Sequence, residues 1–411
     1  MKMAVNKVVY NTEDGEQTLI DLTEDTVTAD TLAEGVTAHS ASGEVIVGTM
    51  ASGTPLAEPK EVNFWDYDGT CLYSYTLAEI QNLTVLPSLP SHDGLICQGW
   101  NWTLAEIKAL GRGVEVGANY ITDDGKTRLY ITLAAEGRTT VPLHIYQTAS
   151  NGVEIDWGDG ATETITGTGN VNTSHTYASI GSYVISLAVS TGAMLLGNSA
   201  SYCIIGSTDV TANPYLSALK KVEIGASMPR ANPGGFYSCY AMETITIPNS
   251  LGNVLANSFA GCNALKCVNL PKGIQNIYST AFHNCHSLQT ITMPSEVLLL
   301  GGYFVSNCYV LERVTIPSCP KIDTYAFYNC KSLSSVAVPS AVSSIGDTAF
   351  NSCNSAAVFD FTHHTAVPTL ASVNAFTGIA SDCKIKVPAA LYNEWIAATN
   401  WTTYADRIVG V

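Results

Sequence analysis

The chain of 411 residues is acidic, with 35 Asp and Glu against 19 Lys and Arg and a formal net charge of −16. Because it has no basic stripe, it is a poor candidate for binding nucleic acid or an anionic membrane, which depends on phosphate neutralisation. Its 46% hydrophobic residues suffice for several domains, yet no apolar run of about 18 residues indicates a membrane-spanning helix, so membrane insertion is not expected.

Residues 1–58 are predicted to be an N-terminal segment and linker rather than a core-forming domain. Short strands are expected at Thr26–Thr28 and Glu44–Val47, and the small residues and prolines of 51–59, ASGTPLAEP, are typical of a linker. The first residues lack the apolar core of a secretory signal, so folding in the cytoplasm is expected. Strands this short need a partner, either another copy of the chain or a larger assembly.

Residues 59–127 are predicted to form a small α+β domain. Two alternating aromatic runs flank Asp68-Gly69, which indicates a hairpin. Capping boxes at Thr76 with Glu79, and at Thr103 with Glu106, predict two short helices.

The segment DYDGT at 66–70 also resembles the nucleophile motif of haloacid-dehalogenase-type phosphatases, in which Asp66 would attack phosphorus and Asp68 would act as acid and base. That chemistry needs a parallel α/β domain, which residues 71–127 are too few to supply. The hairpin is the favoured interpretation.

Residues 128–198 are predicted to form a β-sandwich, because alternating runs are broken by Gly, Asp and Asn turns. The motifs Asp156-Trp157-Gly158-Asp159-Gly160 and His175-Thr176-Tyr177 resemble those of PKD-type domains. The resemblance implies a spacer or binding module. Asp156 and Asp159 could share a Ca²⁺ ion, but they are more readily explained as the side chains that set a tight turn.

Residues 199–382 contain a repeat with a period of about 23 residues, marked by Cys239, Cys262, Cys285, Cys308, Cys330 and Cys353. Most repeats have a Phe three residues before the Cys and an L-x-x-I-x-I-P run after it. Such a period predicts a solenoid in which each coil packs only on its neighbours. One coil departs from the pattern, with Phe304 and Val305 in the usual Ala and Phe slots, and local repacking is expected there.

The repeats resemble the BspA-type leucine-rich repeats of bacterial surface proteins. Residues 383–411 are predicted to cap the last coil through Leu391, Trp395, Trp401 and Tyr404. The cysteines are expected to be free, buried thiols. The expected fold is therefore multidomain and β-rich, with a small α+β unit, a PKD-like sandwich, and a leucine-rich-repeat solenoid with a C-terminal cap.

No catalytic residue, metal ligand or cofactor is predicted, because no nucleophile with a base and no metal-binding spacing occurs. The candidate ligand-binding residues lie between the apolar positions of the repeats and should face solvent. One row comprises Thr246, Asn269, Thr292, Thr315 and Asp360, and a second row comprises Glu243, Lys266, Gln289 and Glu312. Exposed aromatic anchors are expected at Tyr237, Tyr240, Tyr309 and Tyr328.

The segment from Gln17 to Met50 resembles the N-terminal part of tail-fibre proteins of phages and prophages of gut Firmicutes. The resemblance implies a phage tail-fibre or receptor-binding protein in the virion tail, assembled in the host cytoplasm. It would be a homotrimer joined to tail or baseplate proteins, and its repeats would recognise a glycan or protein on the host cell surface. The alternative is a BspA-type adhesin on the bacterial surface. An enzyme is not expected.

Overall fold

The computed structural model describes four strands within residues 1–58 and residues 60–411, with gaps at 136, 149–151, 190–193, 198–202, 207–214, 226–229 and 232–234. The chain divides into two units, Met1–Glu58 and Pro59–Val411. In the first unit, β1 (Lys7–Thr12) pairs antiparallel with β2 (Gly15–Asp21), and β3 (Thr37–His39) pairs with β4 (Val45–Val47). The strand predicted at Thr26–Thr28 lies outside the described residues.

The second unit begins with a small α+β element, here called the cover, which spans residues 60–122. Its sheet has the order β6-β5-β8-β7. Both helices start at the predicted capping boxes, formed by Thr76 with Glu79 and by Thr103 with Glu106. The elements are β5 (Val62–Trp65), β6 (Cys71–Tyr75), α1 (Leu77–Asn82), β7 (Leu95–Trp100), α2 (Leu104–Leu110) and β8 (Val114–Thr122).

The next element is a two-layer β-sandwich. One sheet has the order β13-β10-β15, and the other begins β12-β11-β14-β9. The DWGDG segment forms a tight turn, in which Asp156 and Asp159 accept hydrogen bonds from the main-chain N–H groups of Gly158 and Ala161. The strands are β9 (Thr127–Leu133), β10 (Thr140–Gln147), β11 (Val153–Asp156), β12 (Thr162–Ile165), β13 (Gly169–Thr176), β14 (Gly181–Val189) and β15 (Met194–Leu196).

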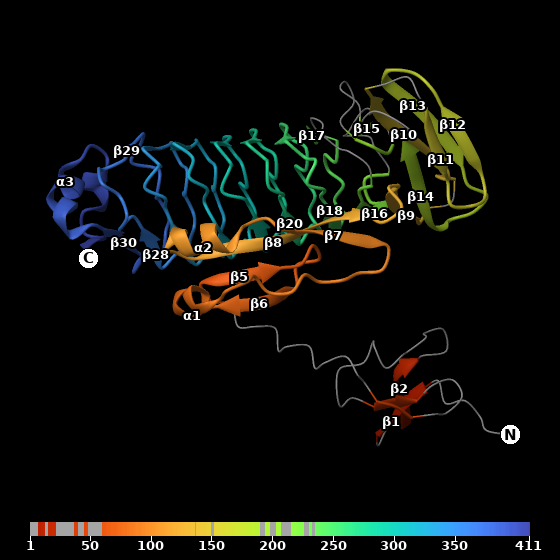
Figure 1. The fold of residues 1–411 in the computed structure, drawn as a ribbon, viewed down its shortest axis with the longest axis horizontal. Coiled ribbons are helices and arrows are strands. Elements are labelled where there is room, and N and C mark those ends of the chain that lie inside the picture. The colour runs from red at the N-terminus through yellow and green to blue at the C-terminus, as the bar shows by residue number, and fades with distance from the viewer. Residues whose placement is uncertain are drawn as a thin grey trace. The chain divides into compact units, whose positions relative to one another are not determined.

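Sandwich and solenoid share one sheet. Strand β9 pairs with β14 on one side and with β16 (Leu219–Glu223) on the other, and β16 pairs in parallel with β18 (Thr244–Thr246) of the first full coil. The buried apolar side chains of both parts form a single cluster. The sandwich therefore seals the first coil of the solenoid and is continuous with it (Figure 1).

Each solenoid coil contributes two short strands to parallel sheets (Figure 1). The first strands form what we call the first-strand face: after β16 and β18 come β20 (Cys267–Asn269), β22 (Thr290–Thr292), β24 (Arg313–Val314), β26 (Ser335–Ala337), β28 (Val358–Asp360) and β30 (Lys384–Val387). The second strands form the second-strand face: β17 (Arg230–Ala231), β19 (Asn253–Val254), β21 (Asn276–Ile277), β23 (Leu299–Leu300), β25 (Lys321–Ile322), β27 (Ser344–Ile345) and β29 (Thr369–Leu370).

Two columns of side chains stack inside the coils. The rings of Phe236, Phe259 and Phe282 lie parallel, with centroids 5.2 and 5.1 Å apart. The stack is interrupted at Phe304, whose ring meets its neighbours edge-on at 6.0 Å. This is the repacking expected for the coil in which a Val occupies the Phe slot.

The cysteine column lies beside the Phe column. Cys285 donates its thiol to the carbonyl of Phe259 in the preceding coil, at 3.2 Å, and four further coils repeat this contact. All twelve cysteines are free, and all but Cys97 are buried. The regular placement of Cys is therefore explained by a thiol that both fills the column and donates between coils.

The last coil is covered by η2 (Ala389–Leu391), α3 (Tyr392–Ala397), η3 (Trp401–Tyr404) and β31 (Ile408–Gly410). Trp395 and Trp401 are fully buried, and Trp401 donates its indole N–H to the carbonyl of Pro368 at 2.8 Å. The predicted cap is present. In the part of the chain that the structure describes, no helix is long and apolar enough to cross a membrane.

Candidate functional site

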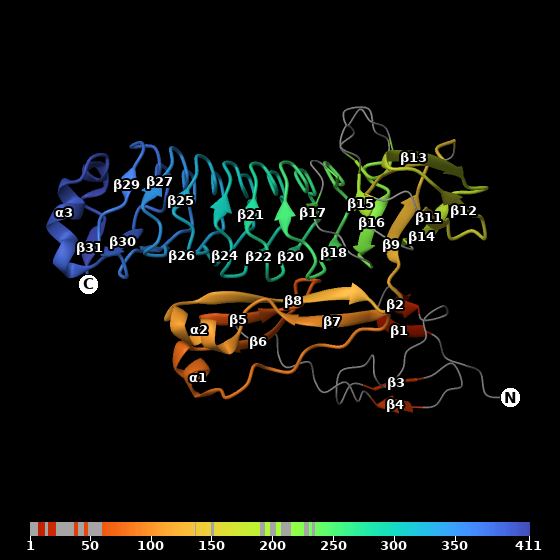
Figure 2. The same ribbon diagram turned by 45° about the horizontal axis from the view of Figure 1, so that its top comes forward.

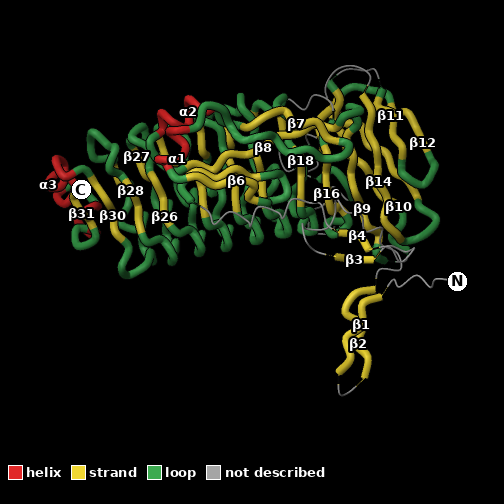
Figure 3. The backbone as a smooth tube through the Cα atoms, turned by 60° about the horizontal axis from the view of Figure 1, so that its bottom comes forward, coloured by secondary structure: helices red, strands yellow, loops and turns green. Residues whose placement is uncertain are grey.

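The first row of candidate binding residues is largely buried by the cover. Strand β8 lies along the solenoid, across successive strands of the first-strand face (Figures 2 and 3). The exposed fractions of Thr246, Asn269, Thr292 and Thr315 are 0, 3, 0 and 2%. The expectation that these four residues face solvent is wrong, because residues 60–122 pack on the row that they form.

Three polar side chains of this row bind the cover instead, whereas the Thr246 hydroxyl accepts the main-chain N–H of Ile224 at 3.0 Å. Asn269 donates its amide to the carbonyls of Trp65 and Ala118, at 3.1 and 3.0 Å. Thr315 accepts the main-chain N–H of Glu115 at 2.7 Å. Thr292 accepts from the Asn101 amide at 3.0 Å. Hydroxyl and amide groups in register thus serve an interface within the chain.

The repeated prolines explain why this face needs a cover. In a parallel ladder the carbonyl of one residue accepts from the N–H one position further along the next strand. In these coils that position is proline, so the carbonyls of Leu270 and Met293 meet Pro294 and Pro317, which have no N–H. An unpaired buried carbonyl costs about 1–3 kcal/mol, so each requires another donor.

The cover supplies one donor to each of five successive coils. Asn119 donates to the carbonyl of Ile247, Asn101 to Leu270 and Trp102 to Met293, at 3.3, 2.8 and 2.9 Å. At the two ends of the series, the main-chain N–H of Thr122 donates to the carbonyl of Ile224 at 3.2 Å, and the guanidinium of Arg112 donates to the carbonyl of Ile316 at 2.8 Å. The sequence contained this signal, because an apolar residue followed by Pro ends five successive strands, at Pro248, Pro271, Pro294, Pro317 and Pro339, and predicts a row of carbonyls without ladder donors.

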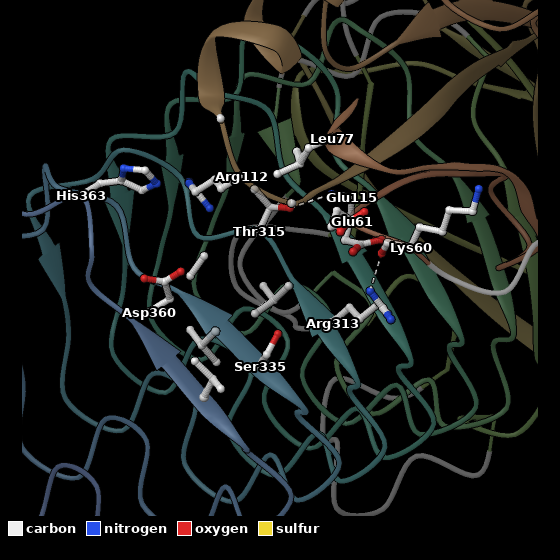
Figure 4. A pocket seen from close by; sticks show the side chains of 16 residues that line it. Lys60, Glu61, Leu77, Arg112, Glu115, Arg313, Thr315, Ser335, Asp360 and His363 are labelled. Carbon is white, nitrogen blue, oxygen red and sulfur yellow. Dashed lines mark hydrogen bonds between the residues drawn. The ribbon is translucent and has the colours of Figure 1, made fainter. Parts of the chain in front are cut away.

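The row becomes accessible where the cover ends. There a pocket of about 400 Å³, here called the cover-edge pocket, lies over β24, β26 and β28 (Figure 4). Asp360, the last member of the predicted row, is half-buried and lines it. Other lining residues are Lys60, Glu61, Leu77, Arg112, Glu115, Arg313, Thr315, Ser335 and His363.

Burial shifts the pKa values of two ionisable groups in the pocket, Glu115 and Arg112. Glu115 is 5% exposed, and desolvation raises its pKa to about 7 even though Trp65 and Asn63 donate hydrogen bonds to its carboxyl group. Arg112 is 9% exposed, and burial lowers its pKa to about 10, so it stays protonated at neutral pH.

The second predicted row faces solvent as expected. Glu243, Lys266, Gln289 and Glu312 are all exposed. Lys266 pairs with Glu243 at 3.1 Å, with both side chains about half exposed, so the pair contributes little to stability. This row remains available to a ligand.

The predicted tyrosines differ in exposure. Tyr240 is 45% exposed, whereas Tyr237, Tyr309 and Tyr328 are half-buried. Tyr309 stacks on His286 with centroids 4.8 Å apart, and the ammonium of Lys331 lies 5.0 Å from its ring centre.

Sequence reasoning missed a more exposed apolar patch on and beside the second-strand face. We call Tyr278, Leu298, Leu299 and Tyr303 the coil patch; their exposed fractions are 39, 59, 38 and 39%. Leu299 of β23 is the register partner of Asn276, two residues before Tyr278. Tyr303 has a left-handed backbone with φ of 57° and stacks on Tyr325 with centroids 4.6 Å apart. The signal in the sequence was Leu298 and Leu299, at positions that are polar in the preceding coil, where Gln275 and Asn276 stand.

The aspartates of the phosphatase-like motif have structural roles. Asp66 is 3% exposed and accepts from Tyr120 and His92, each at 2.7 Å, while Asp68 accepts the N–H of Thr70 within the hairpin turn. Asp159 contacts His175 at 2.7 Å. Within the described ranges, no group of three or more His, Cys, Asp or Glu side chains could hold a metal ion.

Comparison with known proteins identifies residues 217–387 as a BspA type leucine rich repeat region in six copies. This part of the chain is therefore a BspA-type repeat solenoid. No curated protein matches the chain.

Three solved structures are similar over part of their length. A leucine-rich repeat protein from Bacteroides ovatus is 20% identical over 41% of this chain, with a TM-score of 0.32. A leucine rich cell surface protein from Faecalibacterium prausnitzii is 19% identical over 42%, with a TM-score of 0.29. The T. pallidum leucine rich repeat protein is 21% identical over 41%, with a TM-score of 0.26. The matches span 55, 60 and 62% of those chains.

Proposed function

We propose that the chain is an adhesin-like recognition protein that binds a ligand on a cell surface through the uncovered side of its solenoid. The observation that carries the proposal is the coil patch. Four large apolar side chains from neighbouring coils are each more than a third exposed, and exposed apolar clusters of this kind mark sites of interaction. The BspA-type repeat region supports a role in recognition rather than catalysis.

The place of the coil patch on the solenoid also supports the proposal. The first-strand face is occupied by the cover from Ile224 to Ile316, so a large partner has access to the second-strand face instead. Tyr303 and Tyr325 place aromatic side chains at the left-handed position of their coils, where other coils have Asn257, Thr280 and Thr348. The turn of the coil sets this backbone, and the two stacked rings extend the apolar surface beside the second-strand face.

The test is binding of the fluorescently labelled full chain to whole bacterial cells and to immobilised host glycoproteins. Replacing Tyr278, Leu299 and Tyr303 together by Ser should lower saturable binding at least about tenfold, because clustered aromatic and aliphatic anchors dominate such interfaces. Ile180→Ser, which alters a side chain that is 43% exposed on the sandwich, is the matched control. Equal binding by the triple variant and the control would refute the proposal.

A phage tail-fibre role is a second candidate, and it rests on the likeness of residues 17–50 to tail-fibre segments. Neither the repeat family nor the fold of residues 60–411 bears on it. Light scattering of the purified full chain separates the two functions. A trimer that binds host cells favours a tail fibre, and a monomer that binds through the coil patch favours an adhesin.

A further inference from the structure

The cover-edge pocket contains a buried cation whose donors are mostly unused. Arg112 is 9% exposed, and among the described residues its guanidinium makes one hydrogen bond, from Nη2 to the carbonyl of Ile316. Asp360 interacts with it only at longer range. A guanidinium has five N–H donors, and buried charges are normally paired. The unused donors of Arg112 therefore call for an acceptor that enters the pocket.

The other cations of the pocket are engaged. Lys60 pairs with Glu79 at 2.9 Å, and Arg313 donates to the carbonyl of Lys60 at 2.8 Å. Glu61, Glu115 and Asp360 line the same pocket, so a multiply charged anion would be repelled. A single carboxylate matches the planar fork of one guanidinium.

The other residues that line the pocket indicate what kind of molecule carries the carboxylate. Leu77, Ala337 and Val358 are partly exposed and aliphatic, and Ser335 and Asp360 offer oxygen acceptors beside them, whereas Val314 and Val336 point into the solenoid core. Among the described residues that line the pocket, His363 is the one aromatic ring, which disfavours a sugar, since sugars commonly stack on aromatic faces. Aliphatic contacts with side-chain acceptors nearby suit a short peptide.

We propose that the cover-edge pocket binds the carboxyl terminus of a peptide that ends in an aliphatic residue, with the terminal carboxylate paired to Arg112. The aliphatic side chain lies on Ala337 and Val358, and Asp360 or Ser335 accepts a peptide N–H. Figure 4 shows Arg112, Asp360 and His363 around one end of the pocket and Ser335 on its floor. This site is separate from the coil patch, so it can fail or hold independently of the proposed function.

The test is fluorescence polarisation with the full chain and a fluorescein-labelled tetrapeptide, Gly-Gly-Ala-Val, with either a free or an amidated carboxyl terminus. The free acid should bind at least about tenfold more tightly than the amide, because a charge-assisted pair is lost in the amide. Glucuronic acid is the competitor that represents an acidic sugar. Equal affinity for acid and amide, displacement by glucuronic acid but not by unlabelled peptide, or no binding of the peptide by folded protein would overturn the proposal.

Two variants locate the binding. Arg112→Lys keeps a cation but loses the planar fork, and should weaken the free acid about tenfold. Ser335→Trp fills the pocket from the exposed solenoid side without removing a contact of Arg112, and should abolish binding. Ser340→Trp, at an exposed serine outside the pocket, should bind as the unaltered chain does. Unchanged binding by Ser335→Trp places the peptide elsewhere and contradicts the proposal, whatever the stability of the Arg112 variant.

Discussion

Trp102 of the cover donates its indole N–H to the main-chain carbonyl of Met293, 191 residues later in the chain, at 2.9 Å. The bond is needed because the ladder position opposite that carbonyl is Pro317. The cover is thus held to the solenoid by one hydrogen bond to a strand-end carbonyl in each of several successive coils. The contribution of each bond to the free energy of unfolding can be measured.

Trp102→Phe keeps an aromatic side chain but removes the pyrrole part of the indole with its N–H, and leaves the Met293 carbonyl without a donor. We expect a loss of about 1–3 kcal/mol in the free energy of unfolding, measured by chemical denaturation. Pro317→Ala restores an N–H opposite the carbonyl, so Trp102→Phe should cost less in that background. If the cost is the same in both backgrounds, the carbonyl is not the shared partner.

Gly117 of β8 packs tightly against the solenoid. A Cβ atom at this position would clash with Thr292 Oγ1 and with the Asn269 amide. Gly117→Ala should therefore destabilise the union of cover and solenoid by about 1–3 kcal/mol, and limited proteolysis should cut the cover faster. Thr292→Ala alone removes only one of the two clashes, so Gly117→Ala should still be destabilising in that background but by a smaller amount. An equal or larger cost of Gly117→Ala in the Thr292→Ala background would contradict the explanation.

Glu115 makes stability depend on pH. Its pKa rises from 4.5 to about 7 on folding, so the folded state holds the proton more tightly and is most stable when Glu115 is protonated. Unfolding free energy from this group should fall as pH rises from about 4.5 to 7, by up to about 3 kcal/mol. Denaturation of Glu115→Gln at pH 5 to 8 should lack this component, whereas Glu154→Gln, at an exposed glutamate, should retain it.

A substitution at Tyr303 should change binding without a large change in the free energy of unfolding. Tyr303→Asn relieves a left-handed backbone that is unfavourable for a bulky residue but loses ring stacking on Tyr325. These effects offset one another, so the free energy of unfolding should change by less than about 1 kcal/mol. Surface binding should drop all the same, and full binding by a stable Tyr303→Asn protein would remove Tyr303 from the interface.

Local patterns determined the local structure. The repeat of Phe, Cys and Leu-x-x-Ile predicted the solenoid, because each coil repeats the same inward positions. Thr76 with Glu79, and Thr103 with Glu106, predicted both helix starts, since a capping box needs only residues three apart. The Asp68-Gly69 pair predicted the hairpin between β5 and β6 for the same reason.

Only the tertiary structure decided which surfaces are open. The alternation along β20 and β22 correctly places Asn269 and Thr292 outside their coils, but it cannot tell solvent from another part of the chain. Residues 60–122 reach that face from about 150 positions away, and β9 joins the sandwich to the solenoid through pairing with β16. The periodicity of the sequence predicts which way a side chain points within its own coil. It does not predict whether a distant segment packs on that side chain, because such packing depends on the tertiary structure.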